Sequence, residues 1–261
     1  MDILFFVVAF LSSIVGAICG IGGGVVIKPV LDMLQMGAPA TINFLSGCTV
    51  LSMSLYSVSK ALRSGDSKVE MSTGTPLAIG AALGGVVGKE MFSAVKDFFG
   101  GSPMVGGVQA VALGIITLGT LLYTVNKSRI RTHRTSSKVV CMVIGLLLGI
   151  MSSFLGIGGG PINLVVLGYC FSMDTKTAAA NSLYIILFSQ VASLAATLIS
   201  GLPEFRILAL ALMVAGGIGG GIVGRKLNKK MDNRAVDKLF IGLMILIVTI
   251  CVYNAIRAFA G

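Results

Sequence analysis

The sequence predicts an all-α polytopic membrane protein made of two inverted repeats, each a glycine-broken re-entrant helical hairpin followed by three transmembrane helices. Composition is the first observation: 55% of the 261 residues are hydrophobic, 11% are charged, and the mean hydropathy is +0.96. Apolar runs of transmembrane length recur along the whole chain. The second observation is the motif GIGGG, which occurs at 20–24 and again at 156–160. The third is the distribution of basic residues between the apolar runs.

The repeated motif belongs to a longer internal duplication. When the chain is shifted against itself by 136 residues, the alignment from Gly20 to Lys89 needs no gap and contains 19 identities in 70 pairs. We therefore expect one integral membrane domain over 1–261. Its first repeat would cover 1–126, a basic loop 127–138, and its second repeat 139–261.

The predicted elements follow the apolar segments in chain order. In each repeat the first two segments are separated only by the glycine run, and we expect these broken pairs to be 3–20 with 24–37 and 139–155 with 159–172. The remaining six segments are long enough to cross a bilayer. They are 42–62, 70–89, 104–125, 176–200, 205–224 and 236–257.

Basic residues decide whether a broken pair crosses the membrane or returns to its own side, because lysine and arginine concentrate in cytoplasmic loops. If each pair crossed once, the two faces would carry ten and nine basic residues. If each pair returns, one face carries fifteen and the other four. The returning hairpin gives each repeat three crossings, so the second repeat is inverted, an architecture found in transporters.

The same asymmetry predicts the location and partners of the chain. We expect a multi-pass protein of the cytoplasmic (inner) membrane with both termini outside and the loops 60–68, 127–138 and 225–238 inside. The net charge of +10 is explained by these loops. The lipid bilayer is therefore an expected partner and nucleic acid is not; a homo-oligomer is left open.

The glycine runs are the candidate substrate site. Consecutive glycines accept positive φ and leave backbone N–H groups uncovered, and each run is followed by a helix N-terminus with unpaired donors. These features bind anions. If the hairpins enter from opposite faces, their tips meet near the midplane. The site glycines are Gly22, Gly23, Gly24, Gly158, Gly159 and Gly160. The alternative is that these glycines only permit close helix packing.

Polar side chains near the starts of the following spans are candidates to complete this site. They are Thr41 and Ser46 in the first repeat and Thr177, Asn181 and Ser182 in the second. Hydroxyl and amide groups donate to anionic oxygens, but they also join helices by ordinary hydrogen bonds. Two more candidates, Lys28 and Asn163, lie in the helices after the glycine runs. Lys28 would either add positive charge to the pathway or extend to an interface.

Other kinds of chemistry find little support in the sequence. No nucleophile–base pair, metal-binding cluster or nucleotide-binding loop is recognisable, so we expect neither an enzyme nor a cofactor or metal. No carboxylate falls in the middle of a predicted span. The five cysteines lack a CxxC spacing and lie in apolar segments, where packing is their expected role.

Two segments resemble a known family. GAICGIGGGVVIKPVL at 16–31 and GIMSSFLGIGGGPINLVVL at 149–167 are similar to the paired signature of the sulfite exporter TauE/SafE family. Support comes from TAAANSLYIILFS at 177–189, GGVVGK at 84–89 and GGIVGR at 220–225. The resemblance implies transport of sulfite or of organosulfonates such as sulfoacetate. Family members often carry a Thr-Ser pair after each hairpin, where this chain has Leu45-Ser46 and Asn181-Ser182.

The expected function is therefore a secondary transporter that moves small sulfur-containing anions by alternating access. The glycine N–H groups would bind the anion, with Ser46, Asn181 and Ser182 around it. Two alternatives stay open at this stage. One is a thiosulfate uptake conduit that uses the membrane cysteines Cys19 and Cys48, and the other is a membrane assembly factor that transports nothing.

Overall fold

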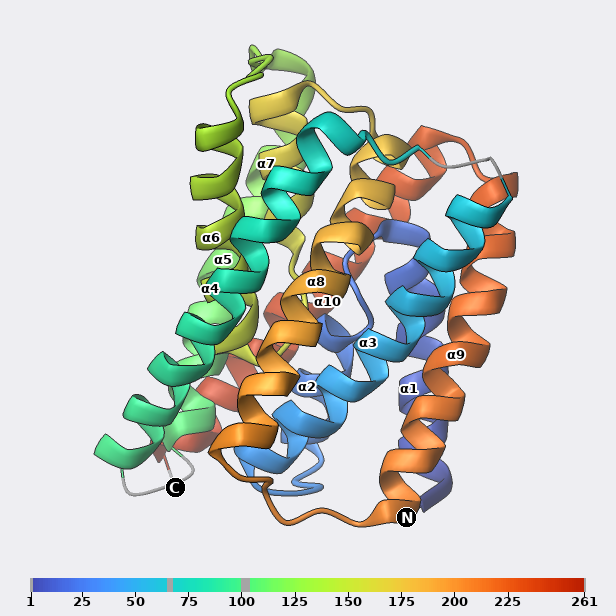
Figure 1. Ribbon diagram of the computed structural model, residues 1–261. Helices are drawn as coiled ribbons and strands as arrows, with labels where there is room; N and C mark the ends of the chain where they lie inside the picture. Colours follow the sequence, from blue (N-terminus) through green and yellow to red (C-terminus); the bar gives the residue numbers. More distant parts are fainter. Residues whose placement is uncertain (1, 65–67, 100–103, 261) are drawn as a thin grey trace.

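The computed structural model describes residues 2–64, 68–99 and 104–260, and helices joined by loops make up this part of the chain, with no strand (Figure 1). The first half contains α1 (Asp2–Cys19), α2 (Gly24–Met33), α3 (Pro39–Arg63), α4 (Met71–Phe98) and α5 (Met104–Asn126). A 3₁₀ turn, Lys127–Arg129, follows. The second half contains α6 (Lys138–Leu155), α7 (Pro161–Phe171), α8 (Thr175–Ser200), α9 (Ile207–Lys230) and α10 (Asn233–Ala260).

Eight of these helices are long and apolar enough to cross a membrane, so the chain is a multi-pass membrane protein. The exceptions are α2 and α7, with 10 and 11 residues. Helices of that length rise about 15 Å, which is half of a hydrocarbon core of about 30 Å. The helices α4 and α9 run past their predicted apolar segments to Phe98 and Lys230, because charged residues interrupt the apolar pattern in their last turns.

The first hairpin turns back at its glycine run. The ion pair between Asp2 and Arg206, at 3.0 Å, places the start of α1 beside the start of α9. Arg257, near the end of α10, donates to the carbonyl of Met33 at the end of α2. Both chain ends lie at this end of the molecule, at the bottom of Figure 1. Cys19, at the end of α1, is buried and leads directly into the buried glycine run, so the chain reverses in the interior and α2 runs back toward the side from which α1 came.

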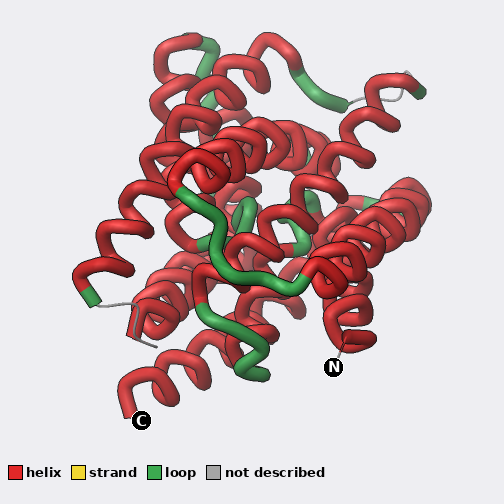
Figure 2. The backbone as a smooth tube through the Cα atoms, turned by 60° about the horizontal axis from the view of Figure 1, so that its bottom comes forward, coloured by secondary structure: helices red, strands yellow, loops and turns green. Residues whose placement is uncertain are grey.

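The second hairpin is built in the same way from the opposite end. The N–H groups of His133 and Thr135, just before α6, donate to the carbonyls of Tyr169 and Cys170 in α7 at 2.7 and 3.0 Å. The start of α6 and the end of α7 are therefore neighbours. The view in Figure 2 shows the green loop segments threaded between the helices in the interior, where both glycine runs lie.

Glycine-spaced stripes lock each hairpin to the other half of the chain. A Cβ atom on Gly84 of α4 would lie 2.1 Å from the carbonyl oxygen of Leu146 in α6, and one on Gly220 of α9 would lie 2.3 Å from that of Phe10 in α1. Backbones this close exclude any side chain and allow Cα–H···O contacts. The glycines that form these contacts are Gly80, Gly84, Gly88, Gly216, Gly220 and Gly224.

Apolar side chains enclose the two glycine runs. Ile21 and Ile157, one from each run, are buried in one cluster with Leu113 of α5 and Phe240 of α10. Cys19 belongs to the same cluster, and Cys48 packs against a second one around the start of α3. The surroundings of these two cysteines are those of apolar packing residues.

Candidate anion site at the hairpin tips

The tips of the two hairpins are in direct contact in the interior. A Cβ on Gly24 would lie 1.9 Å from the carbonyl oxygen of Ile157, and one on Gly159 would lie 3.1 Å from that of Ile21. Residues 20–24 and 157–160 are all buried. Two segments that are far apart in the sequence thus form one structural element, and its backbone is not helical.

The backbone of the tips needs glycine at particular positions. Gly22, Gly158 and Gly159 have φ values of +74°, +69° and +150°, in the region that side chains disfavour. The residues that cap α2 and α7, Gly23 and Gly160, provide no side-chain cap.

Hydrogen bonding at both helix starts begins late. In α2 it begins with the N–H groups of Val26 and Ile27, which both donate to Gly23, and in α7 with Asn163, which donates to Gly160. Among the described residues, the glycine N–H groups that precede them have no acceptor. Buried N–H groups without a partner are rare in proteins, so these donors indicate a place for water or an anion.

Two equivalent side-chain pairs flank the tips. Val50 of α3 contacts Gly158, and Ile186 of α8, its counterpart 136 residues later, contacts Gly159. One helical turn before each lies a serine on the same face, Ser46 and Ser182. The Oγ of Ser46 lies 2.9 Å from the Cβ position of Gly24 and has no hydrogen-bond partner. The structure therefore brings Ser46 to the tips with a hydroxyl that is available to a ligand.

The second repeat adds an amide to the site. Asn163 Nδ2 donates to Ser182 Oγ at 3.3 Å, while its Oδ1 has no partner. Ser13 of α1, which the sequence did not single out, approaches Gly23 and also has an unpaired hydroxyl. A buried polar atom without a partner costs about 1–3 kcal/mol. Such atoms gathered around unpaired N–H groups fit a site that is filled in the working protein.

Three predicted site residues lie elsewhere. The Oγ1 of Thr41 donates to the carbonyl of Glu204 at 2.8 Å, and that of Thr177 donates to the Asp174 carboxylate at 2.7 Å. The Asn181 amide donates to the carbonyls of Lys68 and Thr177 and accepts the N–H of Glu70. These groups brace loops and helix ends, which is the alternative role that polar groups have in membrane proteins.

Lys28 is buried on α2, but its charge is not free. Its Nζ lies 3.1 Å from Asp32 Oδ2, one turn further along the same helix, and its side chain is 3% exposed. Since a paired lysine adds little net positive potential, attraction for an anion must come from the backbone donors and from other cations.

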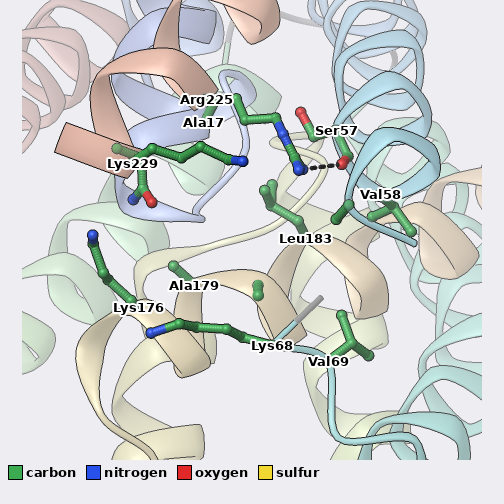
Figure 3. A pocket seen from close by; sticks show the side chains of 13 residues that line it. Ala17, Ser57, Val58, Lys68, Val69, Lys176, Ala179, Leu183, Arg225 and Lys229 are labelled. Atoms are coloured by element: carbon green, nitrogen blue, oxygen red, sulfur yellow. Dashed lines mark hydrogen bonds between the residues drawn. The ribbon is translucent and has the colours of Figure 1, made fainter. Parts of the chain in front are cut away.

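Those other cations line a cavity of about 310 Å³ between the ends of α1, α3 and α9 and the start of α8 (Figure 3). They are Lys68, Lys176, Arg225 and Lys229. Arg225 also donates to the carbonyl of Ser57 at 2.8 Å. The sequence assigned these residues to topology alone. The available signal was Arg225, which ends the glycine-spaced segment 220–225.

The floor of this cavity touches the first tip. Ala179 lines the cavity, and its Cα would lie 2.3 Å from a Cβ on Gly20, the first glycine of the run. The basic residues thus line a cavity at the basic end of the molecule whose floor adjoins the first glycine tip. An anion that enters it would be held among positive charges until it reaches the backbone donors.

Comparison with known proteins identifies the family of this chain. Residues 5–250 match the family model described as sulfite exporter TauE/SafE. A probable membrane transporter protein of Bacillus subtilis, YunE, is 26% identical over 97% of this chain and 98% of its own length. A probable membrane transporter protein of Methanocaldococcus jannaschii is 24% identical over 73% of this chain and 70% of its own. No solved structure matches. The chain therefore belongs to the sulfite exporter TauE/SafE family, whose relatives named here are probable membrane transporters and not enzymes.

Proposed function

We propose that this protein is a secondary transporter that moves small sulfur-containing anions, such as sulfite or organosulfonates of the sulfoacetate type, across the cytoplasmic membrane. The observation that carries the proposal is the contact between the two glycine tips, where unpaired N–H groups and the Ser46 hydroxyl converge in the interior. Two helix N-termini with these donors favour a compact anion that has several oxygens.

The chemistry of the donors supports an oxyanion as the substrate. The N–H groups of Gly23, Gly24 and Gly160, with Ser46, would each donate one hydrogen bond to an oxygen. Ser13 lies close enough to Gly23 to add another donor. Because backbone donors respond to charge and shape, the remainder of an organosulfonate would be read by the apolar side chains Val50 and Ile186.

The arrangement of the helices supports alternating access around this site. The hydrogen bonds at the helix ends turn both hairpins back toward their own sides, from opposite ends of the molecule. We therefore assign six helices as full spans and treat α1 and α6 as hairpin arms. The two halves are then inverted, the basic end is cytoplasmic, and both termini are outside. One half would rock against the other and expose the tips to each side in turn.

The test is anion flux into proteoliposomes that contain the purified protein. Sulfite, sulfoacetate, taurine, thiosulfate and chloride are measured separately, with and without a pH gradient. We expect flux for the sulfur oxyanions and none for chloride. Folded protein that moves none of these anions would contradict the proposal and favour an assembly factor. Thiosulfate flux that disappears when Cys19 and Cys48 are both replaced by alanine would instead favour the cysteine conduit.

A further inference from the structure

A second cavity lies on the other side of the tips and repeats the first. Shifting its lining residues by 136 positions places nine of the eleven on the lining of the basic cavity. Lys89 maps onto Arg225, and Ser193 maps onto Ser57. The two cavities are therefore equivalent under the internal duplication, one on each side of the hairpin tips.

The equivalent cavities differ greatly in size. The basic cavity holds about 310 Å³ and the second about 20 Å³, which is room for little more than one water molecule. Each cavity adjoins its hairpin tip at an equivalent contact. Gly156 packs on Asn43, with a Cβ position 2.1 Å from Asn43 Oδ1, as Gly20 packs on Ala179. By volume, the cavity on the basic side is open and the one on the other side is nearly closed.

The closed cavity contains groups that lack partners. Both polar atoms of the Asn43 amide and the Oγ of Ser153 are buried with no hydrogen-bond partner. The Lys89 Nζ lies 5.3 Å from the ring centre of Phe92. Among the described residues, no carboxylate forms an ion pair with it. An unpaired cation and unpaired donors in one buried space indicate an anionic ligand.

We propose that Lys89, Asn43 and Ser153 form a second anion-binding station, which serves the less basic face when this cavity opens. It rests on the proposed function and takes the same class of substrate, a small sulfur oxyanion. Lys89 would do there what Arg225 does at the basic end. The two stations are chemically unequal, because the basic cavity adds Lys68, Lys176 and Lys229, whereas the second adds neutral donors.

The difference in charge between the two cavities predicts how salt affects the binding of the anion at each face. With four cations, the basic cavity attracts anions at long range and loses that attraction in salt. The second station has one cation and holds its ligand by direct hydrogen bonds, which salt affects less. We expect the half-saturating sulfite concentration to rise more steeply with ionic strength at the basic face than at the other.

The experiment compares Lys89→Gln with the matched variant Arg225→Gln. Labelled sulfite is exchanged against unlabelled sulfite in right-side-out and in inverted membrane vesicles, and the half-saturating concentration is measured at each face. Labelling of Ser136→Cys, in the basic loop, verifies which face is outside. We expect Lys89→Gln to raise the half-saturating sulfite concentration about tenfold at the less basic face only. Arg225→Gln should raise this concentration at the basic face only. Lys89→Arg should restore it.

The outcomes separate this proposal from the proposed function. Absence of sulfite exchange by the wild-type protein would contradict the proposed function itself. Wild-type exchange with unchanged values in Lys89→Gln would overturn the second station. A half-saturating concentration that rises in Lys89→Gln at both faces, or at the basic face alone, would overturn the second station as well. If Lys89→Gln does not accumulate in the membrane, Asn43→Ala is measured in the same way, with the same expected side.

Discussion

The two hairpins share one plan but differ in local backbone conformation and in side chains. Both place a glycine run in the interior and start a short helix there, but Gly24 is the first helical residue of α2, whereas its counterpart Gly160 is the extended cap of α7. The unpaired hydroxyl of Ser13 comes from the first hairpin and the amide of Asn163 from the second. The duplication thus preserved the glycine run and the short helix after it, while the side chains around the two tips diverged.

The most severe test of this comparison is one methyl group placed at Gly24 or at Gly160. In Gly24→Ala the Cβ would meet the Ile157 carbonyl at 1.9 Å, so the tips must separate. Misplacing a site by about 1 Å costs about a hundredfold, and we expect flux to fall by that factor or more. In Gly160→Ala the nearest atom is 3.5 Å away and φ is −157°, so flux should stay near the wild-type level.

Both variants are measured in proteoliposomes at equal amounts of folded protein, as judged by size-exclusion chromatography. Equal flux in the two variants would mean that contact between the tips does not shape the site.

The second test concerns the glycine stripes, which hold the hairpin arms in equivalent ways. Gly84→Leu and Gly220→Leu would each force a side chain against a backbone carbonyl at 2.1 or 2.3 Å. Overpacking costs about 1–3 kcal/mol or more, so we expect both variants to unfold at lower temperature in detergent. Gly119→Leu is the control, because no atom lies within 4 Å of its Cβ position. A loss of stability in the control equal to that in the stripes would refute the packing assignment.

The third test compares the equivalent serines. Ser46 has no hydrogen-bond partner, so Ser46→Ala should leave thermal stability unchanged and lower flux about tenfold. Ser182 accepts a bond from Asn163, so Ser182→Ala leaves that amide unpaired and should lower the free energy of unfolding by about 1–3 kcal/mol. Melting curves and flux are recorded on the same preparations. Loss of stability in Ser46→Ala without loss of flux would assign this serine to packing.

The smallest effect is expected where the chain leaves each hairpin. Asp174 caps α8 by accepting the N–H groups of Lys176 and Thr177, whereas its counterpart Ala38 gives α3 no side-chain cap. Burial alone would raise the pKa of Asp174, but the hydrogen bonds from Thr177 and Lys176 and the charge of Lys68 outweigh it and lower the pKa. The stabilisation is therefore complete above the ordinary carboxyl pKa and is lost as the pH falls through the lowered value.

We expect Asp174→Ala to cost about 1 kcal/mol at neutral pH. The difference from the wild type should shrink in acid, when melting temperatures are compared across pH. A difference that is independent of pH would show that the carboxylate charge plays no part.

Much of the fold could be predicted from the sequence, because the apolar segments and the repeat of 136 residues can both be recognised without knowing any side-chain contact. The glycine runs were recognisable because few residues other than glycine accept positive φ and such close contacts. The site was predicted less completely. Thr41, Thr177 and Asn181 lie at helix ends, and only the folded chain shows that their side chains bond to loops and caps.

The cavity residues were missed for a different reason. Arg225 and Lys89 end equivalent segments, but a basic residue at the end of a span ordinarily reports topology. Their second role becomes visible only when the structure places both beside cavities that adjoin the tips. Comparing equivalent positions of the two repeats, rather than each position alone, is the signal that would have found them.

The central claim is that a small oxyanion binds between the two glycine tips. Selenite has the shape and charge of sulfite, and its anomalous scattering locates it without ambiguity in crystals of the protein. We predict a selenium peak within hydrogen-bond distance of the N–H groups of Gly23, Gly24 and Gly160 and of Ser46 Oγ, which is absent in crystals of Gly24→Ala. Selenium found only in the basic cavity would contradict the claim. So would selenite-containing crystals that show selenium at neither the tips nor the basic cavity.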